Sequence, residues 1–314
     1  MAQSPERVFS DQFLADAGVI SVDLMARALN ADDRADALVQ LERLNNEIMA
    51  MYYNYRGWQK NMLAVFTERE GEAKAEQVKA AIESAAAPER KISAYGLVDG
   101  WKNELSLVKN AIDTGKYDVA EQSARSLHSD ALAFHDGMMS RVTAILSELY
   151  RSYGDQVVQQ TLQTVMDPSV IDPDGKLPFK DKVEQLIFFT RVHLLPFNVT
   201  EDDEKAIFMP DPCPSGARLI RDGHYEAPRN GAKVTDVGPL TYGQNDFPIY
   251  CCHEPAMEIS SVLNTGVPVF IVDPSEQLGI TPCKVYVYKR NEDIPASYFE
   301  RLGLKKPQDL IAKS

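Results

Sequence analysis

The chain has 314 residues, of which 44% are hydrophobic and 25% are charged, and its formal net charge is −13 at pH 7. This composition is typical of a soluble globular protein that is long enough to bury a substantial core. The negative charge argues against nucleic acid or an anionic membrane as a partner. No apolar run reaches the roughly 18 residues that a membrane-spanning helix needs.

The first residues, MAQSPERVFSDQF, lack the basic and apolar segments of a secretory signal. The sequence therefore predicts a cytoplasmic protein. In that compartment, clustered cysteines are expected to be metal ligands or reactive thiols rather than disulfides.

Residues 1–165 are predicted to form a helical bundle. Between residues 21 and 71, apolar side chains recur at steps of three and four, which is the pattern of one buried helix face. These side chains are Leu38, Leu41, Leu44, Ile48, Met51, Tyr52 and Tyr55. The segment AEQVKAAIESAAA is predicted to be a further helix that ends near Pro88.

A weak internal repeat runs through this half at an offset of 80. The segment YRGWQKNMLAVFTE, residues 55–68, aligns with HDGMMSRVTAILSE, residues 135–148. Two related helical units packed against each other would explain the pattern.

Residues 166–177, within MDPSVIDPDGKLP, are rich in Pro, Asp and Gly and are predicted to link the bundle to a second domain. That domain, residues 178–314, begins with a predicted helix in FKDKVEQLIFFTRVHLL. Strands are predicted in KAIFMP, ARLI, FPIYCC, VPVFIVDP and CKVYVYK, and a helix ended by Gly266 in EPAMEISSVLNTG. The predicted fold class is therefore α+β, a helical bundle followed by a mixed domain whose sheet carries the cysteines.

All four cysteines lie in the second domain, and His253 adjoins two of them. The long gaps between them differ from the short knuckles of a zinc finger and indicate three anchor points on a folded domain. Thiolate and imidazole ligands together suit zinc, with iron as the alternative ion. We therefore predict a metal site formed by Cys213, Cys251, His253 and Cys283.

The preference for Cys251 over Cys252 rests on strand geometry. In an extended segment, Cys251 and His253 point to one face, while Cys252 and Glu254 point to the other. This argument fails if a helix has already begun by Cys252. Glu254 is predicted to be the general base for a metal-bound water, with a ligand role or a helix-end charge as alternatives.

Other interpretations of these residues stay open. The cysteines could be small buried apolar residues, and Cys252 could be a nucleophile with His253 nearby. His128 and His135 share a helix face, which fits either an ordinary half-buried pair or a ligand site. His193 is expected in the core or beside the metal.

The segments EDDEKAIFMPDPCPSGARL, PIYCCHE and PCKVYVYK resemble an uncharacterised bacterial family of Cys/His metal-binding proteins over residues 190–290. The resemblance matches Cys213, Cys251, His253 and Cys283, and it implies a metal site there. Members of that family often carry a further cysteine where this chain has Glu254. This departure puts a simple site of four thiolates in doubt.

A second resemblance is to the 4-vinyl reductase domain and to aminothiazoline carboxylate hydrolases. These proteins also combine a helical part with a cysteine-bearing sheet, and their likeness implies a small-molecule pocket beside the metal. A shared fold does not fix a reaction.

The function predicted from the sequence is a zinc-dependent enzyme, a hydrolase or lyase, that acts on a small organic molecule. The alternative is a non-catalytic sensor of a small molecule, with a structural zinc. In both cases the partner is a small molecule, with no nucleic acid and no membrane, and a homodimer stays open.

Overall fold

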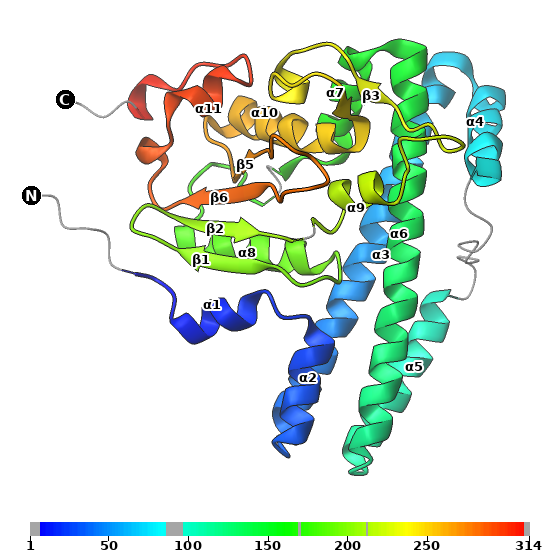
Figure 1. Ribbon diagram of the computed structural model, residues 1–314, viewed down its shortest axis with the longest axis vertical. Helices are drawn as coiled ribbons and strands as arrows, with labels where there is room; N and C mark the ends of the chain where they lie inside the picture. The colour runs from blue at the N-terminus through cyan, green and yellow to red at the C-terminus, as the bar shows by residue number, and fades with distance from the viewer. Residues whose placement is uncertain (1–6, 86–96, 169–170, 212, 311–314) are drawn as a thin grey trace, which may run out of the picture.

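The computed structural model describes residues 7–85, 97–168, 171–211 and 213–310. Two long helices, α3 and α6, run side by side through the molecule, and the C-terminal half lies against one flank of the pair (Figure 1). The helices of the first half are α1 (Asp11–Ala17), α2 (Ser21–Asn30), α3 (Arg34–Glu70), α4 (Glu72–Ala85), α5 (Leu97–Asp113), α6 (Tyr117–Tyr153) and α7 (Asp155–Val165). The predicted helical bundle is therefore confirmed, whereas the expected helix end at Pro88 lies outside the described residues.

The two long helices show a structural repeat. Each has 37 residues, and they begin 83 positions apart, at Arg34 and Tyr117. Both end at a glycine with positive φ, 89° at Gly71 and 78° at Gly154, which glycine adopts at little cost. The helices recur at 83 rather than 80 positions, and a common origin of the two units stays a prediction.

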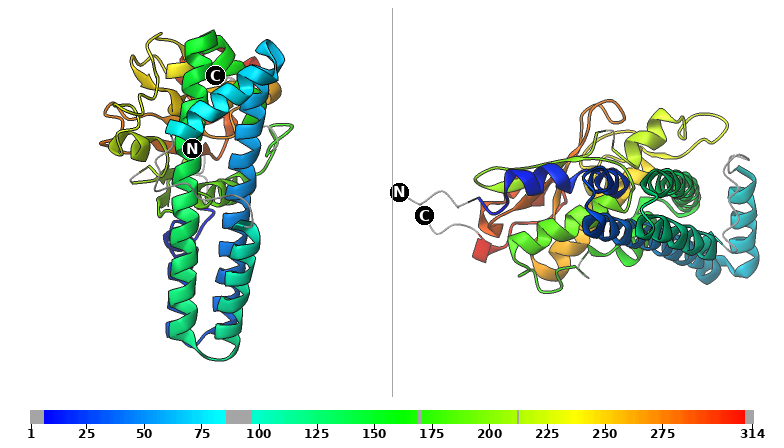
Figure 2. Two further views of the ribbon diagram at one scale, coloured as in Figure 1. Left: turned by 90° about the vertical axis from the view of Figure 1, so that its right-hand side faces the viewer. Right: turned by 90° about the horizontal axis from the view of Figure 1, so that it is seen from below.

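α3 and α6 run in parallel. Asp32 and Tyr117 are hydrogen-bonded near their first turns, and Glu70 and Tyr153 are hydrogen-bonded at their last turns. In Figure 2 the pair extends beyond the rest of the molecule, where α2 and α5 pack against it. None of the described helices combines the length and the apolar character that crossing a membrane requires.

The C-terminal half contains a four-stranded antiparallel sheet in the order β1-β2-β6-β5. Its strands are β1 (Asn198–Glu201), β2 (Lys205–Met209), β5 (Ile271–Asp273) and β6 (Lys284–Tyr288). A two-stranded sheet pairs β3 (Lys233–Val234) with β4 (Phe247–Pro248). The helices are α8 (Phe179–Arg191), α9 (Gly216–Arg221), α10 (His253–Thr265) and α11 (Ala296–Glu300).

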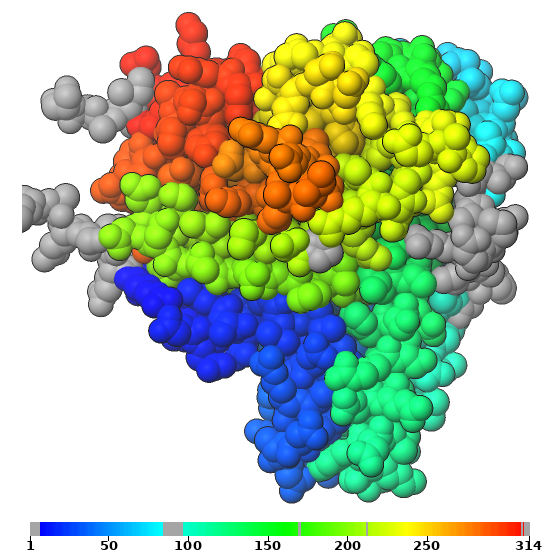
Figure 3. All heavy atoms as spheres, in the orientation of Figure 1, coloured from blue at the N-terminus to red at the C-terminus, as the bar shows by residue number. Residues whose placement is uncertain are grey.

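Each face of the larger sheet packs on different helices, because strand side chains alternate. Phe208 and Val287 lie in a cluster with α1 and α8 residues such as Leu14 and Val183. Tyr286 lies on the opposite face, in a cluster that includes residues of α10 and α11. Figure 3 shows α1 lying directly against the β1–β2 hairpin.

Two predicted strands were wrong. The run ARLI belongs to α9, and in FPIYCC only Phe247 and Pro248 are extended, because Ile249–Cys252 forms a 3₁₀ helix, η4. Apolar runs of four residues carry no clear periodicity, so pattern alone cannot separate strand from helix. The helix predicted to end at Gly266 is confirmed as α10.

The largest hydrophobic core crosses the predicted domain boundary. It includes Leu44 of α3 and Leu146 of α6 together with Leu219 of α9 and Ile249 of η4. Within the predicted linker, the Asp172 carboxylate is buried and lies 3.1 Å from the Lys182 ammonium. The division of the chain at residues 166–177 stays a prediction.

Candidate metal and ligand site

Three of the four cysteines come together from three separate segments. Cys213 lies between β2 and α9, Cys251 lies in η4, and Cys283 directly precedes β6. Burial raises the pKa of the Cys251 thiol well above its usual range, and the neighbouring Cys213 and Cys283 thiols raise it further. A cation would relieve this crowding of groups that become negative when ionised.

Each of these thiols has a specific neighbour. The Cys213 sulfur lies 3.7 Å from the Ser215 hydroxyl, and the Cys283 sulfur accepts a hydrogen bond from the Ser275 amide at 3.5 Å. The backbone of Gly216 lies so close to Cys251 that a β-carbon there would fall 2.5 Å from its sulfur. All three cysteines are free and half-buried by exposed area.

Helix geometry replaces the strand geometry predicted around Cys251. Because Ile249–Cys252 is a 3₁₀ helix and α10 begins at His253, side chains three apart share a face. Cys251 therefore shares its face with Glu254 rather than with His253, and the parity argument is wrong. In agreement with this, burial is the main cause of the raised pKa of both Cys251 and Cys283, and the Glu254 carboxylate adds to it.

His253 faces Glu254 instead of the thiols. Its Nε2 lies 3.1 Å from the Glu254 carboxylate, and its Nδ1 lies 2.6 Å from the Tyr250 carbonyl oxygen. Burial disfavours the imidazolium, but Glu254 outweighs it and raises the pKa of His253. Both ring nitrogens of His253 thus have partners in this arrangement.

Cys252 lies apart from this group. Its side chain is fully buried, and its sulfur lies 3.9 Å from the Pro248 carbonyl oxygen. Burial raises the pKa of the Cys252 thiol strongly, and Asp155 of α7 adds to the effect. A thiol that stays protonated and buried is a poor nucleophile, which disfavours the thiol-enzyme interpretation.

A buried polar network adjoins the cysteines and draws on both halves of the chain. The Tyr55 hydroxyl of α3 lies 3.0 Å from the Tyr250 hydroxyl and 3.2 Å from His135 Nε2. His135 Nε2 also lies 2.9 Å from His193 Nδ1. Burial lowers the pKa of His193 well below its usual range, and the nearby imidazoles of His135 and His253 lower it further. His193 is therefore part of this network, and its place beside a metal stays a prediction.

An ion pair holds the far end of this network. The Asp136 carboxylate lies 3.2 Å from His135 Nδ1 and accepts a hydrogen bond from the Arg218 guanidinium at 2.5 Å. His128 is elsewhere, with its Nε2 2.9 Å from the Leu194 carbonyl oxygen. The ordinary half-buried role predicted for His128 therefore fits its surroundings, whereas His135 belongs to the network.

Sequence reasoning did not assign Tyr55, Asp136, Arg218 or Tyr250 to the site. The only sequence signal was the alignment of Tyr55 with His135 at an offset of 80. These two residues are in fact hydrogen-bonded neighbours. Nothing in the patterns around Arg218 or Tyr250 indicated a polar role.

The donor set suits a soft or borderline metal ion, because thiolates select zinc, copper(I) and iron–sulfur species. As the side chains stand, no three or more His, Cys, Asp or Glu of the described ranges are arranged to hold a metal ion.

Comparison with known proteins adds no assignment. No family model matches the chain, and no curated protein and no solved structure matches it either.

Proposed function

We propose that this protein is a zinc-dependent enzyme that acts on a small organic molecule by hydrolysis or lyase chemistry. One observation carries the proposal. Thiols from three distant segments, Cys213, Cys251 and Cys283, converge beside a polar network that reaches the helical half. The network supplies donors and acceptors that fix a ligand's orientation, as polar groups do in small-molecule sites.

Cys213, Cys251 and Cys283 are the proposed thiolate ligands. If these three thiolates held a zinc ion, the ion would supply Lewis-acid chemistry for a substrate oxygen or a water. The sequence predicts His253 as the fourth ligand. To take that role, the His253 ring would have to release Glu254, its present partner at 3.1 Å.

We therefore propose that Glu254 and His253 act as an acid–base pair beside the thiolates. The Glu254 carboxylate, on the same helical face as Cys251, accepts the proton, as general bases do within hydrogen-bond reach of the reacting group. His253 fixes the carboxylate through Nε2, and its Nδ1–H donates to the Tyr250 carbonyl oxygen. This arrangement orients the proton acceptor before any substrate binds.

The proposed partner is a small molecule, and the proposed compartment is the cytoplasm. A net charge of −13 opposes nucleic acid as a ligand. The four free cysteines are consistent with a reducing environment.

A second candidate is a small-molecule sensor with a structural zinc. The position of Glu254 favours it, because a carboxylate near Cys251 and Cys283 could complete a site of four protein ligands. Closed four-ligand sites are structural rather than catalytic.

Metal analysis of protein purified without chelator tests the metal itself. We expect about one zinc per chain, and protein free of transition metal would refute both candidates. Replacement of zinc by cobalt(II) then tests the coordination. A visible spectrum that changes on addition of azide indicates the open position that an enzyme needs, and an unresponsive four-coordinate spectrum supports the sensor.

The variant Glu254→Gln separates the two roles of the carboxylate. If Glu254 is the proton acceptor, the Gln variant should keep its zinc but lose turnover by about 10²–10⁴-fold. As a ligand, its replacement weakens zinc binding. Retention of both zinc and full turnover would leave only a helix-end charge and refute the mechanism.

A further inference from the structure

A cleft of about 450 Å³ opens between α3, α4 and α6. This volume lies within the range of small-molecule sites, about 300–1,000 Å³. None of its lining residues belongs to the cysteine site. Its apolar lining comes from all three helices and includes Leu63, Ala64, Ile82 and Ile145.

Positive charge surrounds this apolar lining. Four cationic side chains line the cleft, and only Glu76 and Glu83 oppose them; the cations are Arg56, Lys60, Lys79 and Arg141. This excess reverses the sign of the chain as a whole, which carries −13. A local field of this kind attracts anions to a protein that otherwise repels them.

The cations of α4 and α6 already pair with carboxylates, whereas those of α3 pair with none among the described residues, and the Arg56 guanidinium lies 5.9 Å from the centre of the Tyr52 ring. The Lys79 ammonium lies 3.4 Å from the Glu76 carboxylate, and an Arg141 Nη2 lies 3.6 Å from that of Glu83. Within the described ranges, no carboxylate lies at ion-pair distance from Arg56 or Lys60. These two residues are four apart on α3, so they project on one side of the helix.

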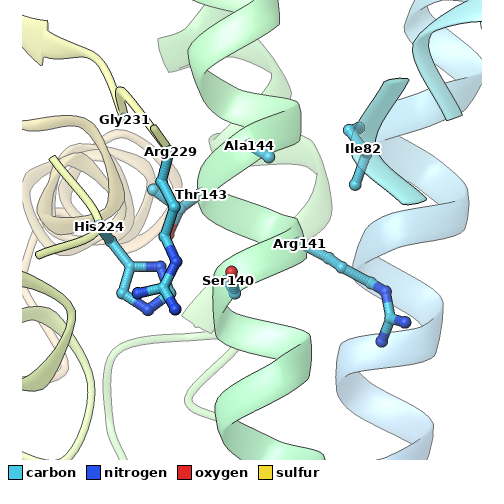
Figure 4. Close-up of a pocket in the computed structure, with 8 residues that line it drawn as sticks. All are labelled: Ile82, Ser140, Arg141, Thr143, Ala144, His224, Arg229 and Gly231. Carbon is cyan, nitrogen blue, oxygen red and sulfur yellow. The ribbon is translucent and has the colours of Figure 1, made fainter. Parts of the chain in front are cut away.

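Arg141 brings a mostly buried cation to the wall of the same cleft. Its side chain is only 12% exposed, and its Nε is buried with no hydrogen-bond partner among the described residues. Figure 4 shows Arg141 and Ile82 on one side of α6, with His224 and Arg229 on the other. The Arg141 guanidinium is held by the Glu83 carboxylate, so it adds positive charge to the wall of the cleft, while Arg56 and Lys60 remain for the head of a ligand.

We propose that this cleft binds a small amphiphilic anion, with its apolar body between α3, α4 and α6 and its anionic head at Arg56 and Lys60. A medium-chain carboxylate has the required chemistry. The apolar lining accounts for the body of the ligand, and the two unpaired cations account for its charge. The inference is independent of the cysteines and of the proposed reaction.

Isothermal titration of the full-length protein with decanoate, below its micelle concentration, tests the proposal. We expect saturable binding of one decanoate per chain and at least tenfold weaker binding of uncharged decanol. The double variant Arg56→Gln/Lys60→Gln should weaken decanoate binding at least tenfold. Lys102→Gln, an exposed charge on α5, removes one cation outside the cleft and should leave the affinity unchanged.

A second variant tests whether decanoate binds in this cleft, by filling the cleft with a larger side chain. Ala64→Phe adds a ring to the cleft and should abolish decanoate binding while circular dichroism shows an unchanged fold. Cys251→Ser should bind decanoate like the unmodified protein, which separates this site from the proposed metal centre.

Several outcomes would overturn the proposal. They are the absence of saturable decanoate binding, equal affinity for decanol and decanoate, and an equal loss in Lys102→Gln. Co-sedimentation with anionic phospholipid vesicles without binding of monomeric decanoate would instead assign the cations to a membrane surface.

Discussion

Cys251 and Cys252 are adjacent in the chain, but their thiols occupy different surroundings. Cys251 is near Cys213, Cys283 and Glu254, whereas Cys252 is fully buried toward α7. We expect Cys251→Ser to abolish stoichiometric zinc, while Cys252→Ser retains it. Elemental analysis of both variants after gel filtration is the measurement. Equal zinc loss in both would contradict the assignment of Cys251 rather than Cys252 as the ligand.

The sequence identified the cysteines that converge but not how they converge. Spacing and local context predict a shared site for Cys213, Cys251 and Cys283. The structure brings these three thiols together. The pairing of Cys251 with His253 failed because it assumed an extended segment. Local pattern could not show that η4 forms, since four apolar residues fit either geometry.

At the scale of elements, the start of α9 is packed against η4. Gly216 leaves no room for a side chain, because a β-carbon would approach the Cys251 sulfur to 2.5 Å. We expect Gly216→Ala to lower the free energy of unfolding by about 1–3 kcal/mol, as overpacking does, and to weaken zinc binding. Urea denaturation and metal titration measure the two effects.

Gly100→Ala is the matched control. Gly100 lies in α5, and a β-carbon there would meet nothing within 4 Å. Because alanine is the better helix former, this variant should be neutral or more stable. A Gly216→Ala protein that behaves like it would show that the contact with Cys251 is loose.

A second contact between elements depends on pH. The buried Glu201 carboxylate of β1 accepts hydrogen bonds from the amides of Val8 and Phe9 and lies 2.7 Å from the Lys289 ammonium. Burial opposes ionisation, but these partners outweigh it and lower the pKa of Glu201 below its ordinary 4.5. The folded state therefore gains stability above pH 4.5, which is lost as the pH falls through the lowered pKa.

We therefore expect the segment around Val8 and Phe9 to detach in acid before the sheet unfolds. Hydrogen exchange at these two amides, corrected for intrinsic rates, should show protection at pH 6 that is lost below the pKa of Glu201. Glu201→Gln should lower this protection already at pH 6. Protection in Glu201→Gln equal to that of the unmodified protein at pH 6 would contradict the assigned role of Glu201.

Alternation of apolar and polar residues predicts some strands of the sheet but not others. The sequences KAIFM and KVYVY predict strands β2 and β6, as the structure confirms. Alternate side chains of these strands lie in two different hydrophobic clusters, one on each face of the sheet. The run NVTE of β1 has a mixed burial pattern and was not predicted. Its pairing with β2 comes from tertiary contact rather than from its own residues.

For the whole molecule, the contact between the halves includes a hydrogen bond deep in the core. The Tyr55 hydroxyl of α3 bonds to that of Tyr250, and both side chains are almost completely buried. Tyr55→Phe leaves Tyr250 and His135 short of a partner, so we expect a loss of about 1–3 kcal/mol in unfolding free energy.

Tyr53→Phe serves as the comparison, because Tyr53 is 60% exposed on the same helix. Chemical denaturation of both variants should show a shift for Tyr55→Phe alone. Equal stability would mean that water replaces the lost hydroxyl. Two transitions in Tyr55→Phe, where the unmodified protein has one, would show that the halves can unfold separately.

The polar network joins segments of the chain that are far apart, and this has an evolutionary consequence. All proposed metal ligands are encoded between codons 213 and 283, whereas Tyr55 and His135, beside them, are encoded in the first half of the gene. If the proposed function holds, mutations in α3 and α6 change which molecule is accepted while Cys213, Cys251 and Cys283 stay intact. Reactivity and selectivity would then be inherited through separate stretches of one gene and could drift at different rates.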